Sequence, residues 1–256
     1  AISSSMISYG ERSSPRHVLK GNIYTSTDHP ADQHILLHNE QSYTLNWPMK
    51  ILFFCLRPAQ QGGRTPIADS RTIFSRLPSL LVEKFVQKQV MYVRNYGDNL
   101  GLSWQEAFQT DDRAIVEEHC RREAIEFDWK EGNRLRTKQT RPAVRTHPRT
   151  GETTWFNHAV FFNVHSLDPA ARDALRAGMD DFDLPFNTFY GDGSPIEASV
   201  IEQIYEIYRQ EQVAFDWQLG DILMLDNMLV AHGREPFVAP REIAVAMADP
   251  YTDLRG

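Results

Sequence analysis

The sequence predicts a mainly β fold with peripheral helices, an α+β arrangement, in a single domain over residues 1–256. Three observations support this prediction. Short apolar runs rich in β-branched and aromatic residues recur along the chain and are bounded by Gly, Pro or Asp. Helix signals occupy only a few segments between these runs. No repeat or linker-like stretch divides the sequence, which is long enough to bury a substantial core.

Five apolar runs are predicted as strands. They cover residues 51–56, 153–163, 213–217, 221–225 and 243–247. Several short strands spread along one chain are typical of a β sandwich or barrel.

Four segments are predicted as helices on the outside of this core. Two are marked by caps: Ser103 stands three residues before Glu106, which is capping-box spacing, and Asp168 precedes a Pro suited to a first helical turn. The other two, residues 78–89 and 195–210, repeat apolar residues at helical spacing.

Composition excludes several functional classes. A formal net charge of -7 gives no overall attraction to phosphate backbones or anionic membranes, so neither nucleic acid nor membrane is expected as a partner. No apolar run approaches membrane-spanning length. The Ser-rich residues 1–14 lack a secretory signal pattern, and the two cysteines form no CxxC pair. These features predict a cytoplasmic protein, and they leave the oligomeric state open.

Two distant segments carry the residues of a candidate metal site. His38 and Glu40 are two positions apart after an apolar stretch, and on an extended segment such residues project from the same side. His232 follows a short apolar strand and a turn-like Asp-Asn pair. Two histidines and one carboxylate occupy one face of an octahedron, which suits iron(II) that must also bind a bidentate co-substrate and O2.

Arg241 and Thr65 are candidates for binding a dicarboxylate co-substrate. Arg241 lies nine positions after His232, and its guanidinium is a planar fork for a carboxylate. Thr65 lies in a Gly-Gly-Arg-Thr-Pro stretch and offers a hydroxyl donor. Two alternatives stay open, because Arg234 is a rival cation and Thr65 is also suited to a simple turn.

Together these motifs resemble the TauD/TfdA group of iron(II)- and 2-oxoglutarate-dependent dioxygenases, especially its SyrP-like members. The matching stretches are His-Asn-Glu at 38–40, Gly-Gly-Arg-Thr-Pro-Ile-Ala-Asp-Ser-Arg at 62–71, Trp-Phe-Asn at 155–157, and Ala-His-Gly-Arg at 231–234 through Pro-Arg at 240–241. The resemblance implies a double-stranded β-helix (jelly-roll) core of the clavaminate synthase-like type. It also implies that His38, Glu40 and His232 bind Fe(II), that Thr65 and Arg241 bind 2-oxoglutarate, and that O2 is the second co-substrate.

The resemblance also implies a reaction class. It indicates hydroxylation of an unactivated C–H bond in an amino acid or amino-acid derivative, free or tethered to a peptidyl carrier protein, in natural product biosynthesis. Desaturation and cyclisation stay open on the same scaffold. Related halogenases have a small residue where Glu40 stands, so Glu40 favours hydroxylation. Taurine dioxygenase has Asp there, so its sulfonate substrate is not carried over. Relatives usually carry an additional N-terminal segment, which we expect to be missing here.

Two further residues are candidates for substrate binding. Asn157 is a polar side chain between apolar neighbours, so we expect it to face the active-site cavity, whereas Trp155 and Phe156 are expected in the core. Arg145 belongs to a basic run over residues 134–149 that contains no acid. Such a run is typical of a solvated loop, and the functional alternative is capture of an acidic substrate or carrier arm at the active-site mouth.

Two other function classes use the same residues. A zinc hydrolase would hold its metal with the same three ligands and an activated water, but it has no evident general base and no role for Arg241 or Thr65. A non-catalytic jelly-roll binding protein would keep the ligand set without turnover.

Overall fold

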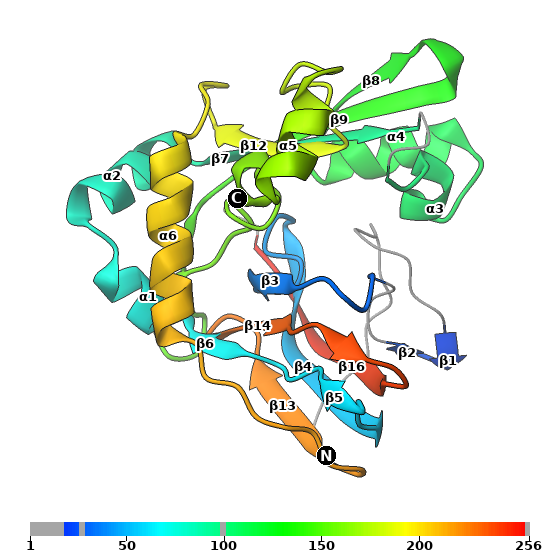
Figure 1. Cartoon of the computed structure of the whole chain (residues 1–256). Helices are drawn as coiled ribbons and strands as arrows, with labels where there is room; N and C mark the ends of the chain where they lie inside the picture. Colours follow the sequence, from blue (N-terminus) through cyan, green and yellow to red (C-terminus); the bar gives the residue numbers. More distant parts are fainter. Residues whose placement is uncertain (1–17, 26–28, 98–100, 254–256) are drawn as a thin grey trace.

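The computed structural model describes residues 18–25, 29–97 and 101–253 of the chain (Figure 1). The signal-peptide prediction concerns residues 1–14, which lie outside this part. Among the described residues, no helix combines the length and the apolar character needed to cross a membrane.

Antiparallel pairing builds all the sheets of the described part. A five-stranded sheet has the order β1 (Val18–Lys20), β2 (Ile23–Thr25), β16 (Glu242–Thr252), β4 (Asn46–Arg57) and β13 (Ile222–Asp226). A four-stranded sheet has the order β12 (Phe186–Tyr190), β7 (Val90–Tyr96), β9 (Arg134–Arg141) and β8 (Glu126–Lys130). A three-stranded sheet has the order β3 (Ile35–His38), β14 (Val230–Arg234) and β6 (Ile67–Asp69). Two-stranded pairs join β10 (Val144–Thr146) to β11 (Thr153–Trp155) and β15 (Phe237–Val238) to β5 (Gln61–Gly62).

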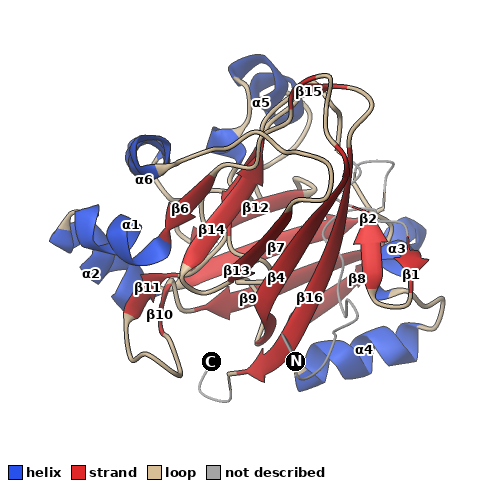
Figure 2. Cartoon of the chain, turned by 90° about the horizontal axis from the view of Figure 1, so that it is seen from below, coloured by secondary structure: helices blue, strands red, loops and turns tan. Residues whose placement is uncertain are grey.

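Helices flank the sheets in two groups (Figures 1 and 2). One group comprises α1 (Ser70–Arg76), α2 (Ser79–Lys88) and α6 (Ala198–Glu211), and the other comprises α3 (Trp104–Phe108) and α4 (Arg113–Arg122) beside β8. The remaining helices are α5 (Pro169–Arg176) and two 3-10 turns, η1 (Glu131–Asn133) and η2 (Val164–Ser166). The strand content and arrangement agree with a jelly-roll core, so the predicted fold class is confirmed.

Local sequence signals located some of these elements. Three predicted strands lie within or overlap β4, β13 and β16, and the predicted helices correspond to α2, α3, α5 and α6. The capping box of α3 is present, because Ser103 accepts from the Glu106 backbone and the Glu106 side chain accepts from the Ser103 backbone. Asp168 caps α5 by accepting from the backbone N–H groups of Ala170 and Ala171.

Two predicted strands are wrong in extent or type. The run at 153–163 is a strand only over β11, because the Asn157 side chain accepts from the Ala159 N–H at 2.9 Å and turns the backbone. The run at 213–217 makes only a single bridge, between Val213 and Ile67, and its later residues have no strand partner among the described residues.

The solvated-loop interpretation of residues 134–149 is also wrong, because this run forms β9 and β10. Arg141 lies at 3% exposure and donates to the carbonyls of Glu123 and Thr140. Alternate residues of β9 face inward, so part of the charged run is buried.

Candidate metal centre and co-substrate pocket

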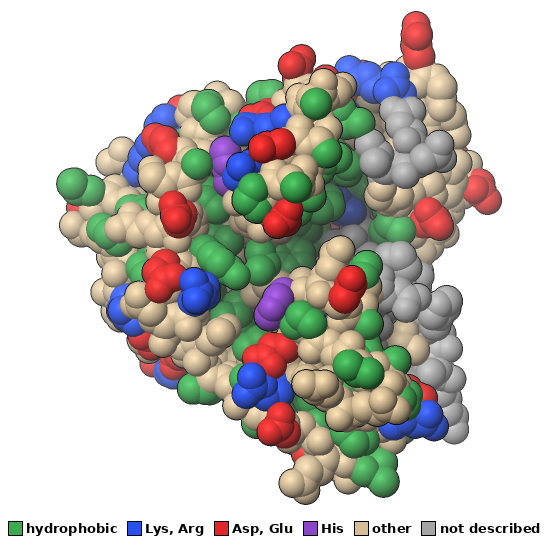
Figure 3. Space-filling model, viewed as in Figure 1, with side chains coloured by type: hydrophobic (Ala, Val, Ile, Leu, Met, Phe, Trp, Pro, Cys, Tyr) green, Lys and Arg blue, Asp and Glu red, His purple; other side chains and the backbone are tan. Residues whose placement is uncertain are grey.

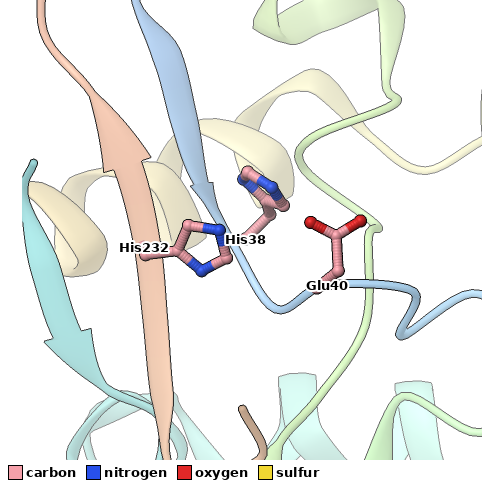
Figure 4. A group of neighbouring side chains, drawn as sticks. All are labelled: His38, Glu40 and His232. Atoms are coloured by element: carbon pink, nitrogen blue, oxygen red, sulfur yellow. The ribbon is translucent and has the colours of Figure 1, made fainter. Parts of the chain in front are cut away.

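Three potential metal ligands meet between β3 and β14. His38, the last residue of β3, is the direct cross-strand partner of His232 on β14, and their ring centroids lie 4.6 Å apart. Glu40 follows in the turn after β3 (Figure 4). One ligand atom from each of the three residues lies within 4.8 Å of the others, so the structure brings the predicted triad together.

The donor set fits a divalent iron ion. His38 Nδ1 lies 2.8 Å from the Leu36 carbonyl oxygen. A carbonyl can only accept, so Nδ1 carries the proton and Nε2 keeps its lone pair for a metal. Two imidazoles on paired strands and a carboxylate in the turn that follows one of them leave the opposite side of an octahedral ion open.

The position of Glu40 is fixed through its backbone by Asn227, in the turn between β13 and β14. The Asn227 Oδ1 accepts from the Glu40 N–H at 2.7 Å, and its Nδ2 donates to the Glu40 carbonyl at 2.8 Å and the Pro48 carbonyl at 2.9 Å. Asn39 donates in turn to the Asn227 carbonyl at 2.7 Å. Asn227 and Asn39 are fully buried, so this network ties the turn that carries Glu40 to the turn that precedes β14.

Aromatic rings lie beside both histidines of the candidate site. Phe161 lies 4.4 Å from the His38 ring and Phe53 lies 5.2 Å from the His232 ring, measured between centroids. His158 packs edge-on to His38 at 5.5 Å, and its Nδ1 lies 2.6 Å from the Ser42 hydroxyl. Burial, together with the nearby His38, His232 and Arg94, holds the pKa of His158 well below its usual range. His158 is therefore a neutral neighbour of the site.

A pocket adjoins the three ligands and contains both predicted co-substrate residues. Thr65, Arg241 and Arg234 provide its polar groups beside the ligands, and its apolar walls come from Ile35, Phe53, Ile243 and Val245. The space-filling view shows a hollow in this face of the molecule, lined largely by hydrophobic side chains, with a histidine visible in it (Figure 3). The candidate metal ligands and a cationic side chain thus line the same apolar recess.

The hydrogen bonds of the two pocket arginines separate their roles. Arg234 donates through both terminal nitrogens to the carbonyls of His29, Pro30 and Gln33, so its guanidinium ties down that loop. Arg241 donates only Nε, to the Gly63 carbonyl at 2.9 Å, and its terminal nitrogens have no hydrogen-bond partner among the described residues. Burial lowers the pKa of Arg241 to about 10. Of the two arginines, Arg241 is therefore the better candidate for binding a carboxylate.

Two glycines allow the close approaches that shape this pocket. At Gly63, where φ is +72°, a Cβ would lie 2.9 Å from the Arg241 side chain. At Gly233, a Cβ would lie 2.5 Å from the Ile35 carbonyl oxygen, so the glycine lets β14 approach β3 beside His232.

The two predicted substrate residues do not line this pocket. Asn157 donates to the Ala143 carbonyl at 2.8 Å and accepts from the Ala159 N–H, so its amide supports the local backbone. Arg145 is buried, forms an ion pair with Asp253 and lies over the Trp47 ring. Their roles in substrate binding stay predictions.

The sequence reasoning missed three residues around the site. Asn227 belongs to the Asp-Asn pair that the sequence marked only as a turn. Trp217 donates from its indole Nε1 to the Thr65 hydroxyl at 2.9 Å. His158 follows the Trp-Phe-Asn stretch directly, but it has no spacing partner in the sequence that would mark it as a ligand, so it was expected to be structural.

Comparison with known proteins finds a matching family and several relatives of this chain. The model of a protein family described as "Taurine catabolism dioxygenase TauD, TfdA family" matches residues 1–247. The chain is 39% identical over 244 residues to the dapdiamide synthesis protein DdaC of Enterobacter agglomerans, covering 95% of this chain and 74% of that protein. It is 28% identical over 245 residues to a clavaminate synthase-like protein of Arabidopsis thaliana, covering 91% and 70%.

The fold is shared with a solved structure of asparagine oxygenase in complex with Fe(II), 3-hydroxyasparagine and succinate. The TM-score is 0.52 at 11% identity, and the match covers 89% of this chain but 56% of that chain. At this identity the likeness concerns the fold.

Proposed function

Because the chain belongs to the TauD/TfdA family of iron(II)- and 2-oxoglutarate-dependent dioxygenases, we propose that it hydroxylates an amino-acid-like substrate at a centre built by His38, Glu40 and His232. The observation that carries this proposal is the convergence of these three side chains, with ligand atoms within 4.8 Å, beside a pocket that contains Arg241 and Thr65. The family gives no support to the zinc hydrolase or the non-catalytic binding protein.

In this proposal, 2-oxoglutarate lies in the pocket with its keto acid end at the metal and its distal carboxylate at Arg241 and Thr65. The pocket suits such a molecule, because metal ligands, polar donors and apolar walls lie around one recess. Arg241 supplies a desolvated guanidinium with unused terminal nitrogens, and a carboxylate there would compensate for the hydration that burial removes.

Iron(II), 2-oxoglutarate and O2 together supply the oxidising chemistry when bound. The chain's own residues hold the ligands, orient the co-substrate and exclude water. Glu40 completes the ligand set with an acid, which favours hydroxylation as the outcome. Phe161 and Phe53 keep the neighbourhood of the two histidines apolar.

The substrate proposal rests on the relative at 39% identity. DdaC is named for dapdiamide synthesis, so we propose a substrate of the amino-acid class within natural product biosynthesis, either free or tethered to a peptidyl carrier protein. We also propose that the protein works in the cytoplasm, where a buried thiol such as Cys55 stays reduced.

Two measurements test the proposed function. Anaerobic addition of ferrous iron and then 2-oxoglutarate to the purified protein should produce their visible charge-transfer absorption, and His232→Ala should remove it. A screen of free and carrier-bound amino acids for succinate release under air should then identify the substrate class. Full iron binding without that absorption, and without succinate release from any candidate, would refute the proposal.

A further inference from the structure

The segment between α6 and β13 places one indole N–H against the candidate co-substrate residue Thr65. This segment was predicted as a strand, but beyond Val213 it has no strand partner among the described residues. Trp217 lies within it, at 7% exposure, and its Nε1 donates to the Thr65 hydroxyl oxygen at 2.9 Å. The two residues are 152 positions apart in the sequence.

Trp217 lies behind Thr65 and does not line the pocket. Thr65 is among the lining residues, whereas Trp217 is not. The indole instead packs in an apolar cluster that includes Phe53, Leu225, Ile243 and Val245. Phe215 stacks edge-on against it at 4.9 Å. The indole is thus held in place by apolar packing, and its single polar atom is directed at Thr65.

The chemistry of the two groups limits the directions that the hydroxyl proton can take. An indole N–H can only donate, so Trp217 occupies a lone pair of the Thr65 oxygen. The Thr65 hydroxyl then keeps its own hydrogen, and no described residue other than Trp217 hydrogen-bonds to it. A carboxylate can only accept, so a hydroxyl whose proton points into the pocket is a better partner than one that rotates freely.

We propose that Trp217 is a positioning residue for 2-oxoglutarate: its indole N–H holds the Thr65 hydroxyl so that the hydroxyl proton is presented to the distal carboxylate. This inference rests on the proposed function, because it assumes that Thr65 contacts the co-substrate. It assigns a role in co-substrate affinity to a segment whose sequence pattern resembled a plain strand.

The test compares Trp217→Phe with a matched control. Trp217→Phe keeps an aromatic ring in the cluster and removes only the donor. Trp104→Phe makes the same change at 3% exposure in a different apolar cluster, where the indole donates to the Asn133 carbonyl at 3.0 Å. The dissociation constant of 2-oxoglutarate is measured by calorimetry on anaerobic protein loaded with ferrous iron, and the midpoint of thermal unfolding is recorded for each variant.

We expect Trp217→Phe to raise the dissociation constant about five- to tenfold, the effect of losing one oriented hydrogen bond. Trp104→Phe should leave the constant unchanged, although both variants lower the unfolding midpoint. In a Thr65→Val background, which should itself weaken binding, Trp217→Phe should have no additional effect, because its action passes through the hydroxyl.

The outcomes separate this inference from the function on which it rests. If Thr65→Val leaves 2-oxoglutarate binding unchanged, the proposed placement of the co-substrate is wrong. If Thr65→Val weakens binding but Trp217→Phe does not, or if Trp217→Phe weakens binding equally with and without the threonine hydroxyl, only the positioning role is overturned.

Discussion

Asn227 is expected to control iron binding although its side chain is not a ligand. Its amide satisfies three backbone groups, the N–H and carbonyl of Glu40 and the carbonyl of Pro48, within 2.7 to 2.9 Å and with no exposure to solvent. In Asn227→Ala these groups lose their partners. A buried polar group left unsatisfied costs roughly 1 to 3 kcal/mol, and water filling the new space offsets part of this, so we expect a loss of about 3 kcal/mol in the free energy of unfolding.

The same change should release the turn that positions the Glu40 carboxylate. Residues that orient metal ligands typically contribute about ten- to hundredfold to metal affinity. We therefore expect the iron(II) dissociation constant of Asn227→Ala to rise by about that factor. Metal affinity is measured by anaerobic titration at a temperature where the variant is fully folded, and stability by urea unfolding.

Asn187 on β12 offers a matched control for this prediction. It is also buried, at 3% exposure, and its amide accepts from the backbone of Val164 and Thr188 and donates to the Asp181 carbonyl. Asn187→Ala should cost similar stability and leave iron affinity unchanged. Equal iron affinity in Asn227→Ala and Asn187→Ala would show that the amide network is only structural, and the reasoning about Glu40 would fail.

Four further substitutions test the remaining parts of the site and fold. Glu40→Ala should abolish substrate-coupled succinate formation, and near-normal succinate release would contradict the ligand assignment. Addition of 2-oxoglutarate to the iron-loaded protein should raise its unfolding temperature, and Arg241→Met should remove this rise. Arg234→Met should keep the rise but lower the unfolding temperature of the protein without iron and 2-oxoglutarate. Asp69 caps α1 and pairs with Arg71, and these contacts lower the pKa of Asp69. The stabilisation that ionised Asp69 contributes is therefore fully present above the unfolded pKa of 3.8 and is lost as the pH falls through the lower folded pKa. Asp69→Asn should therefore cost about 1 kcal/mol in urea unfolding at neutral pH, and this difference should disappear in strong acid.

Sequence patterns predicted β4 and β16, which border the candidate pocket, but not β3 and β14, which carry the two histidines. The residues at 51–56 and 243–247 are continuous apolar runs with two neighbouring strands each, so composition alone indicated them. His38 and Glu40 were expected to converge through strand alternation. In the structure β3 ends at His38, and Glu40 reaches the centre through a turn held by Asn227. The predicted outcome was correct, but its cause is a contact between distant segments.

The wrong predictions have both local and long-range causes. The run at 213–217 has strand composition, but strand formation requires a neighbour, and only Val213 finds one. The run at 153–163 contains Asn157, whose side chain competes for the backbone and ends the strand early. Arg145 looked like a surface cation because charge is usually solvated, and only the fold reveals that Asp253 and Trp47 lie beside it.

The candidate site depends on two segments of the chain that are far apart in sequence. Residues 38–65 carry His38, Glu40 and Thr65, and residues 217–241 supply His232 and Arg241 together with the two side chains that hold Glu40 and Thr65 in place. Neither segment alone contains all three candidate metal ligands or both candidate carboxylate-binding residues. A metal bound across β3 and β14 would therefore stabilise the pairing of these segments. Metal affinity should fall with any change that loosens the contact between the segments, even where no ligand is altered.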